Sequence, residues 1–415
     1  MEKVINIKGL KQLNFFQPNF LILILQSKQK KKKTKLDTGY QLKPNTLLLF
    51  SIISVLIFFT LSFIISILFI VQPISAQTNL SSSSSLSANQ TQDILDPLPS
   101  WKDLTVKHNI IEFVQNVTDS EKTNYYIPPD DRIAVFDNDG TLWSEKPIPF
   151  QGYFSIDRVP TVVAKNPELK SISPFKEILA KNFTSLKDMT EKEAMDLIVT
   201  THSNISEIEF NNFVKKWAQN ATHPETKKLF VDMIYQPMLE LLHFLKTNLF
   251  KEFIVSGGGV DFMREALSSV YKIPKDQIIG SSLKYKFVDE INNTNNDINY
   301  NKSFIFREPV LDSFDNTYEK PANIALHIGK VPVIVAGNSD GDLQMLEYAN
   351  DNNPIGKSLK ILIHHDDPIR EFSYDKGAEK VLEESKKRNW NIVSMKDDFV
   401  TIFPSIGNKI FDVSK

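Results

Sequence analysis

The stretch Ile133-Ala134-Val135-Phe136-Asp137-Asn138-Asp139-Gly140-Thr141-Leu142-Trp143 decides the fold of this chain. An apolar run leads directly into two aspartates that stand two residues apart, and Gly-Thr follows at once. A short run of β-branched and aromatic residues is typical of a buried parallel strand. Because open α/β sheets place their chemistry at the carboxyl ends of such strands, the two acids are predicted to lie at the reactive edge of a sheet.

Further apolar runs follow at 253–255, 333–336 and 359–363, and segments with helical spacing, such as 238–245, 260–270 and 342–349, lie among them. Alternating strands and helices are the signature of a mostly parallel sheet. We therefore expect the α/β class, with a Rossmann-like sheet. Two alternating runs, at 283–287 and 303–306, predict an additional β-hairpin.

The first two predicted strands are separated by far more residues than one crossover helix needs. Helical patterns recur in this span, at 174–182, 191–200, 206–219 and 224–247. They predict a helical cap subdomain inserted at about 144–250. Because the insertion directly follows the paired acids, it is placed to cover them as a lid that excludes water. The alternative is an insertion that only adds core.

Composition excludes several classes of function. The chain has 415 residues, a formal net charge of −2 and no cysteine. A near-neutral charge gives no argument for a nucleic-acid partner. The lack of cysteine removes disulfides, thiol catalysis and cysteine metal sites.

The N-terminal part of the chain has a different composition from the rest. Residues 1–45 are predicted to be a basic cytoplasmic segment, and residues 46–71 an apolar transmembrane anchor long enough to cross a ~30 Å hydrocarbon core. Residues 72–100 are predicted to be a Ser-rich linker, followed by a globular domain over 101–415. This order places the globular domain outside the cytoplasm. A cleaved signal peptide and a secreted protein are the alternative.

Four polar pieces follow the predicted strands or open a helix. They are Asp137-Asn138-Asp139-Gly140-Thr141, Val255-Ser256-Gly257-Gly258-Gly259, Lys320-Pro321, and Gly337-Asn338-Ser339-Asp340-Gly341-Asp342. Phosphoryl transfer explains the set, because a carboxylate can attack phosphorus while a second acid serves the leaving oxygen and then water. A hydroxyl, glycine amides and a lysine suit the phosphoryl oxygens, and Mg²⁺ bound by acids offsets the repulsion between carboxylate and phosphate.

These motifs resemble those of the haloacid dehalogenase-like hydrolase superfamily, in particular its phosphoserine-phosphatase-like phosphatases, over roughly residue 101 to the C-terminus. The resemblance implies Asp137 as nucleophile and Asp139 as general acid/base, with the Asp139 main-chain carbonyl also on Mg²⁺. It implies Ser256, Gly257 and Lys320 as phosphate binders, and it makes 101–415 a catalytic domain. A second aspartate favours a phosphatase over a dehalogenase, because a departing halide needs no proton.

One position departs from the family pattern, because Gly337-Asn338 stands where these phosphatases usually carry Gly-Asp. A neutral Asn oxygen is a poorer Mg²⁺ ligand than a carboxylate. Either Asn338 still binds the metal, or Asp340 or Asp342 takes over the charge. We expect a metal shell of Asp137, Asp139, Asn338 and Asp342.

The predicted function is a Mg²⁺-dependent phosphatase that acts on a small-molecule phosphomonoester through an aspartyl-phosphate. A catalytically weak phosphate-binding or surface-interaction module on the same fold is the alternative. Lys330 is a rival for the role of Lys320. The His-His-Asp-Asp run at 364–367 suggests a metal cluster, but neighbouring residues at a strand end point to opposite faces.

Overall fold

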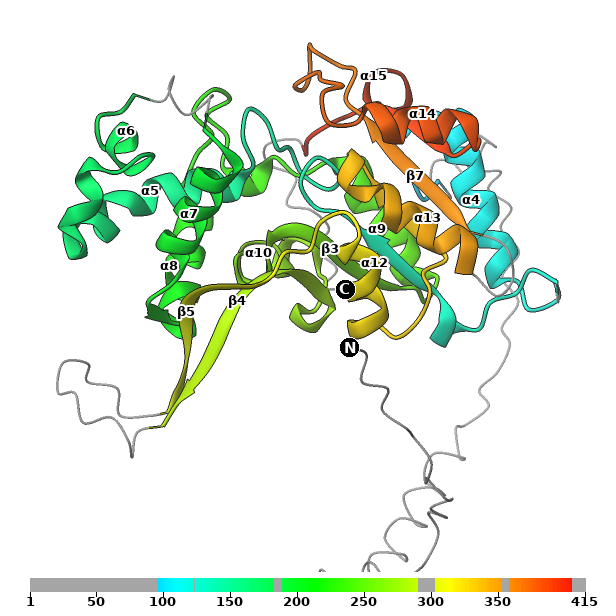
Figure 1. Ribbon diagram of the computed structural model, residues 1–415. Helices are drawn as coiled ribbons and strands as arrows, with labels where there is room; N and C mark the ends of the chain where they lie inside the picture. The colour runs from blue at the N-terminus through cyan, green and yellow to red at the C-terminus, as the bar shows by residue number, and fades with distance from the viewer. Residues whose placement is uncertain (1–95, 123, 183–188, 290–302, 353–357, 405–415) are drawn as a thin grey trace, which may run out of the picture. The chain divides into compact units, whose positions relative to one another are not determined.

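The computed structural model describes residues 96–122, 124–182, 189–289, 303–352 and 358–404 (Figure 1). All described residues lie in one compact unit, Leu86–Lys415. The predicted segments 1–45 and 46–71, and the linker up to residue 95, fall outside the described residues. Among the residues that are described, no helix is both long enough and apolar enough to span a membrane.

Within the described ranges, eight strands form one sheet in the order β2-β5-β4-β3-β1-β6-β7-β8. The strands are β1 (Ile133–Phe136), β2 (Ile205–Ser206), β3 (Lys251–Gly259), β4 (Ile278–Val288), β5 (Phe304–Ser313), β6 (Ile334–Gly337), β7 (Leu359–His364) and β8 (Asn391–Ser394). From β4 to β8 in this order every pair is parallel, whereas β5 runs antiparallel to both β4 and β2. The prediction of an α/β fold with a mostly parallel sheet is confirmed.

The helices of the described residues fall between these strands. They are α4 (Thr105–Thr118), α5 (Phe150–Lys165), α6 (Phe175–Leu179), α7 (Glu191–His202), α8 (Glu207–Asn220), α9 (Gln236–Thr247), α10 (Val260–Ala266), α11 (Ser268–Tyr271), α12 (Glu319–His327), α13 (Leu343–Asn352), α14 (Glu379–Lys387) and α15 (Met395–Asp398).

Strand β1 is buried on both of its faces, as an internal strand of a parallel sheet must be. Ala134 and Phe136 belong to one apolar cluster, which they share with α4, α9 and α10. Ile133 and Val135 belong to a second cluster with α12, α13 and α14. This alternation explains why every residue of the run is apolar. The folded unit also takes in Leu98, which is fully buried although it lies in the predicted linker 72–100.

The helix predicted over 224–247 is shorter than expected. Only α9 and a short 3₁₀ helix, Phe230–Asp232, are helical in this range. Pro237 of α9 occupies the first turn, where a missing N–H does no harm. Upstream, His223 Nδ1 accepts the main-chain N–H groups of Glu225 and Thr226, and Lys227 adopts a left-handed φ of 62°. These local bonds form a turn where the sequence pattern indicates a helix.

The cap contains two separate parts of the chain. Helices α5 to α8 come from the insertion after β1, and they lie together in Figure 1 with the outer part of the β4–β5 hairpin. Strand β2, between α7 and α8, pairs with β5 through Ile205 and Arg307, and both helices pack against β5. Helix α9, although inside the predicted range 144–250, packs instead against β3 in the core.

Candidate active site

Three of the predicted motifs lie at the same edge of the sheet. Strand β1 pairs in parallel with both β3 and β6, so the residues that follow these strands come together. The main-chain N–H of Asp137 donates to the Ala336 carbonyl at 2.9 Å, which ties the end of β1 to the end of β6. The structure thus brings Asp137 and Asn338 to one place, and Ser256 lies on the neighbouring strand β3.

Lys320, the second residue of α12, reaches into this edge. Its Nζ lies 2.6 Å from Asp137 Oδ1 and 2.6 Å from Asp342 Oδ1, and all three side chains are almost fully buried. Burial alone would lower the pKa of Lys320, but the charges of the two carboxylates raise it above its ordinary value. The lysine is therefore a firmly charged bridge between the two acids. Its rival Lys330 pairs with Asp131 at the surface.

Burial raises the pKa of both motif aspartates. The pKa of Asp137 lies above its ordinary value because burial and the charge of Asp342 outweigh the attraction of Lys320. The pKa of Asp139 is raised to about 6, by burial first and then by the nearby charge of Glu145. A carboxyl group with a pKa near neutral can both give and take a proton, as a general acid/base must.

Trp143 holds the side chain of Asp139. Its indole Nε1–H donates to Asp139 Oδ1 at 2.7 Å, while the rest of the ring is buried against Phe150. Gly140 completes the turn with a φ of 79°, and a Cβ at this position would stand 2.1 Å from Asn338 Nδ2. Only glycine fits this turn without displacing Asn338.

The glycine run after Ser256 forms an irregularity between β3 and β4, where the register shifts between Ser256 and Gly259. The Ser256 hydroxyl accepts the N–H of Gly258 at 3.2 Å, which leaves its own O–H able to donate to another group. A Cβ on Gly258 would lie 3.4 Å from Asp139 Oδ2. The serine and glycine motif therefore lies against the second aspartate.

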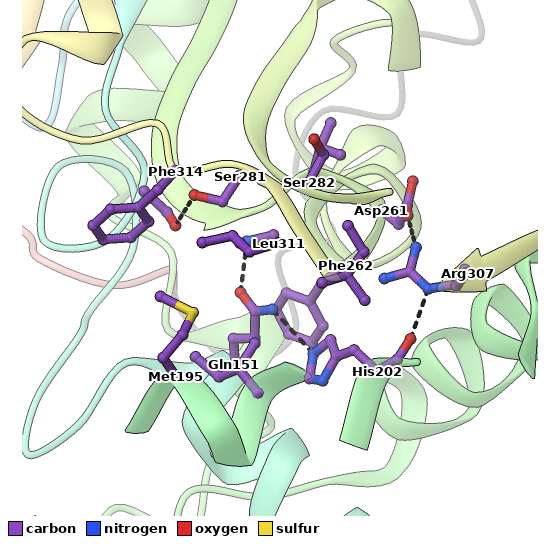
Figure 2. Close-up of a pocket in the computed structure, with 15 residues that line it drawn as sticks. Gln151, Met195, His202, Asp261, Phe262, Ser281, Ser282, Arg307, Leu311 and Phe314 are labelled. Atoms are coloured by element: carbon purple, nitrogen blue, oxygen red, sulfur yellow. Dashed lines mark hydrogen bonds and ion pairs between the residues drawn. The ribbon is translucent and has the colours of Figure 1, made fainter. Parts of the chain in front are cut away.

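The cap contacts this loop directly through Gln151 of α5. Its Oε1 accepts the N–H of Gly259 at 2.7 Å, and its Nε2 lies 3.0 Å from His202 Nε2 at the end of α7 (Figure 2). The predicted insertion thus covers the motif edge. Gln151 carried no signal in the sequence.

Asp342, the last residue of the fourth motif, fixes the backbone of the same motif through hydrogen bonds. Its Oδ2 accepts the main-chain N–H groups of Asn338 and Ser339, both at 3.0 Å, and its Oδ1 accepts Lys320. Both carboxylate oxygens of Asp342 are thus occupied by protein donors. Asp340 points elsewhere, since its Oδ1 accepts the N–H of Val381 in α14 at 2.8 Å. The predicted metal role of Asp342 and the alternative role of Asp340 stay predictions.

Asn338 contacts both the first motif and two side chains beside it. Its Oδ1 accepts the Thr141 hydroxyl at 3.1 Å, and its Nδ2 lies 3.4 Å from both Glu145 Oε1 and Tyr374 Oη. An amide presents an oxygen and a nitrogen of nearly equal shape, so a half-turn of the side chain exchanges the two.

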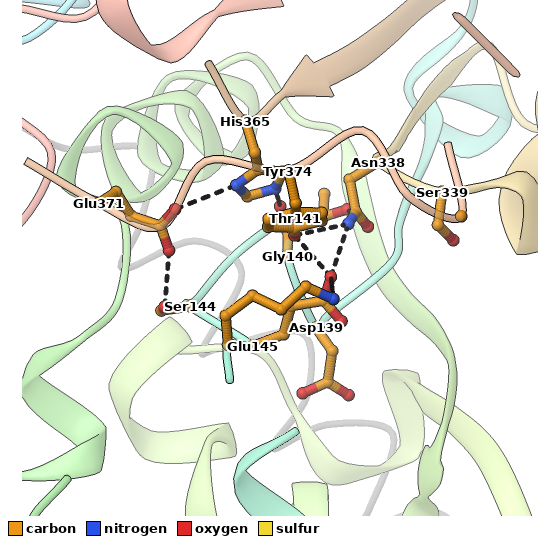
Figure 3. Close-up of polar contacts among 12 residues, drawn as sticks. Asp139, Gly140, Thr141, Ser144, Glu145, Asn338, Ser339, His365, Glu371 and Tyr374 are labelled. Carbon is orange, nitrogen blue, oxygen red and sulfur yellow. Dashed lines mark hydrogen bonds and ion pairs between the residues drawn. The ribbon is translucent and has the colours of Figure 1, made fainter. Parts of the chain in front are cut away.

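Sequence analysis missed a buried polar network beside the first motif (Figure 3). His365 Nε2 lies 2.8 Å from the Gly140 carbonyl, and its Nδ1 lies 3.3 Å from Glu371 Oε2. The other oxygen of Glu371 accepts the Ser144 hydroxyl at 2.6 Å. His364, by contrast, faces Asp375 at the surface, as expected for neighbours at a strand end. His365 therefore supports the turn of the first motif.

The donor atoms at this edge suit a hard cation. The described residues contain no cluster of three or more His, Cys, Asp or Glu side chains placed to hold a metal. Mg²⁺, however, is bound in proteins by one or two carboxylates, with water and substrate oxygens filling its other positions. Asp137, Asp139 and Asp342 share Lys320 as their nearby cation. Buried acids in excess of buried cations fit a site that takes up positive charge.

No family model and no curated protein matches the chain. Among solved structures it is similar to a phosphoserine phosphohydrolase-like protein from Francisella tularensis, at 17% identity, covering 63% of this chain and 94% of the other, with a TM-score of 0.34. A haloacid dehalogenase family hydrolase from Salmonella enterica serovar Typhi matches at 14% identity, covering 72% of this chain and 90% of the other, with a TM-score of 0.31.

A probable phosphoserine phosphatase from Vibrio cholerae matches at 14% identity, covering 65% of this chain and 68% of the other, with a TM-score of 0.32. Among solved structures the chain is thus similar to a haloacid dehalogenase family hydrolase and to phosphoserine-phosphatase-like proteins.

Proposed function

We propose that this chain is a Mg²⁺-dependent phosphomonoester hydrolase that works through a phosphorylated Asp137. The observation that carries the proposal is the buried bridge of Lys320 between Asp137 and Asp342, beside Asp139. A lysine in this place offsets the charge of a phosphoryl group next to an attacking carboxylate. Ser256 and the amide of Gly257 supply further donors for the phosphoryl oxygens.

The chemistry proceeds in two balanced steps. A carboxylate oxygen of Asp137 attacks phosphorus, the bond from phosphorus to the ester oxygen breaks, and Asp139 gives its proton to the departing alkoxide. Asp139 then takes a proton from water, whose oxygen attacks the phosphorus of the aspartyl-phosphate. The bond between phosphorus and Asp137 breaks, and inorganic phosphate leaves with both aspartates restored.

The metal ion would be held by the Asp137 carboxylate, the Asp139 main-chain carbonyl and the side-chain oxygen of Asn338. When bound, Mg²⁺ supplies the positive charge that lets an anionic carboxylate approach an anionic phosphate. Asp342 would be the fourth ligand, and it also positions Lys320 and the N–H groups of Asn338 and Ser339 in the fourth motif.

Hydrolysis of a panel of phosphomonoesters, with Mg²⁺ and with EDTA, tests the proposal. We expect turnover that EDTA abolishes, and a loss of at least ~10³-fold in Asp137→Asn. Asp131→Asn, which alters an exposed acid in a surface ion pair, is the control and should keep full activity. Full activity of Asp137→Asn would contradict the mechanism. Phosphate binding without turnover would favour the alternative, a binding module weakened by Asn338.

We further propose that residues 46–71 anchor the protein in a membrane, with the catalytic domain outside the cytoplasm. The apolar composition of this segment and the lysines before it support the proposal. Protease added to whole cells should then digest the catalytic domain, and a protected domain would refute the proposal. Release of the domain into the medium would favour the signal-peptide alternative.

A further inference from the structure

A cavity of about 60 Å³ adjoins the proposed phosphate-binding loop (Figure 2). Its wall includes Gly257 and Gly259, the neighbours of Ser256 in the loop. A Cβ on Gly258, between them, would lie 3.4 Å from Asp139 Oδ2 and 3.6 Å from Gln151 Oε1. The cavity therefore adjoins the loop that lies against Asp139, and it has room for several water molecules or a short organic group.

Much of the lining of this cavity is apolar, and it comes from both cap and core. The apolar lining side chains are Met195, Ile198, Val260, Phe262, Leu283, Leu311 and Phe314. The two parts of the cap both contribute, since Met195 lies on α7 and Leu311 on β5. An organic group that enters the cavity thus meets mainly carbon atoms.

The two charged side chains among the described lining residues neutralise each other. Asp261 and Arg307 are both buried and form a close ion pair. Arg307 Nε also donates to the His202 carbonyl at 2.7 Å, and the Tyr285 hydroxyl donates to Asp261 Oδ2 at 2.7 Å. These contacts commit both charges to the protein.

Two neutral polar side chains of the wall, Gln151 and His202, likewise contact each other. Gln151 bonds to Gly259 and His202, and His202 Nδ1 lies 2.9 Å from the Thr201 hydroxyl. Burial, together with the charges of Arg307 and Arg158, lowers the pKa of His202 well below its ordinary value. The imidazole is therefore neutral at physiological pH.

We infer that the substrate is the phosphate ester of an uncharged, largely apolar alcohol, whose organic group occupies this cavity. The inference rests on the proposed phosphatase function and names its substrate class. The carboxylate and ammonium of phosphoserine would be buried there without partners, and burial of an unpaired charge is strongly unfavourable. The chain thus selects against amino-acid phosphates even though its motifs resemble those of phosphoserine phosphatases.

The test compares four esters of primary alcohols with the full-length protein and Mg²⁺: isobutyl phosphate, O-phospho-L-serine, O-phosphoethanolamine and 2-phosphoglycolate. We expect kcat/KM for isobutyl phosphate to exceed that for each charged ester by on the order of tenfold or more. Equal or faster hydrolysis of a charged ester would overturn the inference and leave the phosphatase proposal intact. Hydrolysis of none of the four would overturn both.

A pair of variants on β5 tests whether the cavity sets this preference. Leu311→Arg adds a cation to the wall, whereas Val310→Arg adds one to the adjacent residue, which is half exposed and does not line the cavity. We expect Leu311→Arg to raise the ratio of phosphoglycolate to isobutyl phosphate hydrolysis about tenfold, and Val310→Arg to leave it unchanged. Equal ratios in the two variants would overturn the assignment of the cavity.

Discussion

Replacing Lys320 with Met tests whether the charge of this lysine stabilises the two buried carboxylates, Asp137 and Asp342, at the carboxyl edge of the sheet. The substitution keeps a long, flexible side chain and removes the charge that lies 2.6 Å from both Asp137 and Asp342. Breaking a buried ion pair by deleting one partner costs about 3–5 kcal/mol, because the remaining charge is left uncompensated. Since one lysine here serves two carboxylates, we expect a loss at the upper end of that range at pH 9.5.

The loss should shrink as the pH falls. Burial already raises the pKa of Asp137 above its unfolded value of 3.8, and removal of Lys320 raises it further. Below the wild-type pKa of Asp137, which burial raises to about 8, both folded proteins hold this proton, so it affects their stabilities alike. Above that pKa only the wild type carries a carboxylate paired with Lys320, so Lys320→Met should be closer to the wild type at pH 7 than at pH 9.5.

Urea unfolding in EDTA, followed by tryptophan fluorescence at both pH values, measures this. Lys330→Met is the matched control, because Lys330 pairs with Asp131 at the surface, where both side chains are about half exposed. It should change stability by less than about 1 kcal/mol at either pH. A loss in Lys320→Met that is no larger than in the control, or that does not depend on pH, would refute the account of the site.

Three further substitutions probe other parts of the structure. Glu252→Gln should stabilise the protein by a few kcal/mol at pH 8.5 and hardly at pH 4.5 in thermal unfolding, since burial raises the pKa of Glu252 from 4.5 to about 8 and the folded state loses stability as that proton dissociates. Trp143→Phe should lower kcat by on the order of tenfold in steady-state assays, because Asp139 loses its charge-assisted hydrogen bond; an unchanged kcat would refute this role. Gln151→Leu should destabilise the protein by about 1–3 kcal/mol in urea, since the N–H of Gly259 loses its acceptor, and unchanged stability would contradict this.

The parts of the fold that could be predicted are those with a strong local pattern. Strand β1 needs apolar side chains on both faces, so its run is visible without knowledge of its neighbours. The fourth motif could be placed because it follows the apolar strand β6. Lys320 could be preferred to Lys330 because Lys330 stands too close to the strand to reach back, and the structure brings Lys320 to Asp137.

The parts that could not be predicted depend on partners distant in the chain. Helix α5 contains Pro160, which weakens its helical pattern, and its buried face is recognisable only once α6 and α7 pack on it. The link from His365 to Gly140 joins residues from two different loops. No periodicity encodes such a contact, since a loop's path is set by the elements that it connects.

The pairing of β2 with β5 means that the cap is not a transferable module. Its strands come from either side of the second motif, so the cap cannot be replaced by exchanging one continuous segment. A chimera that exchanged only the segment after β1 would separate the β4–β5 hairpin from β2, which is its partner strand in this chain. Under the proposed function, substrate preference can be moved to a relative only by transplanting both segments together.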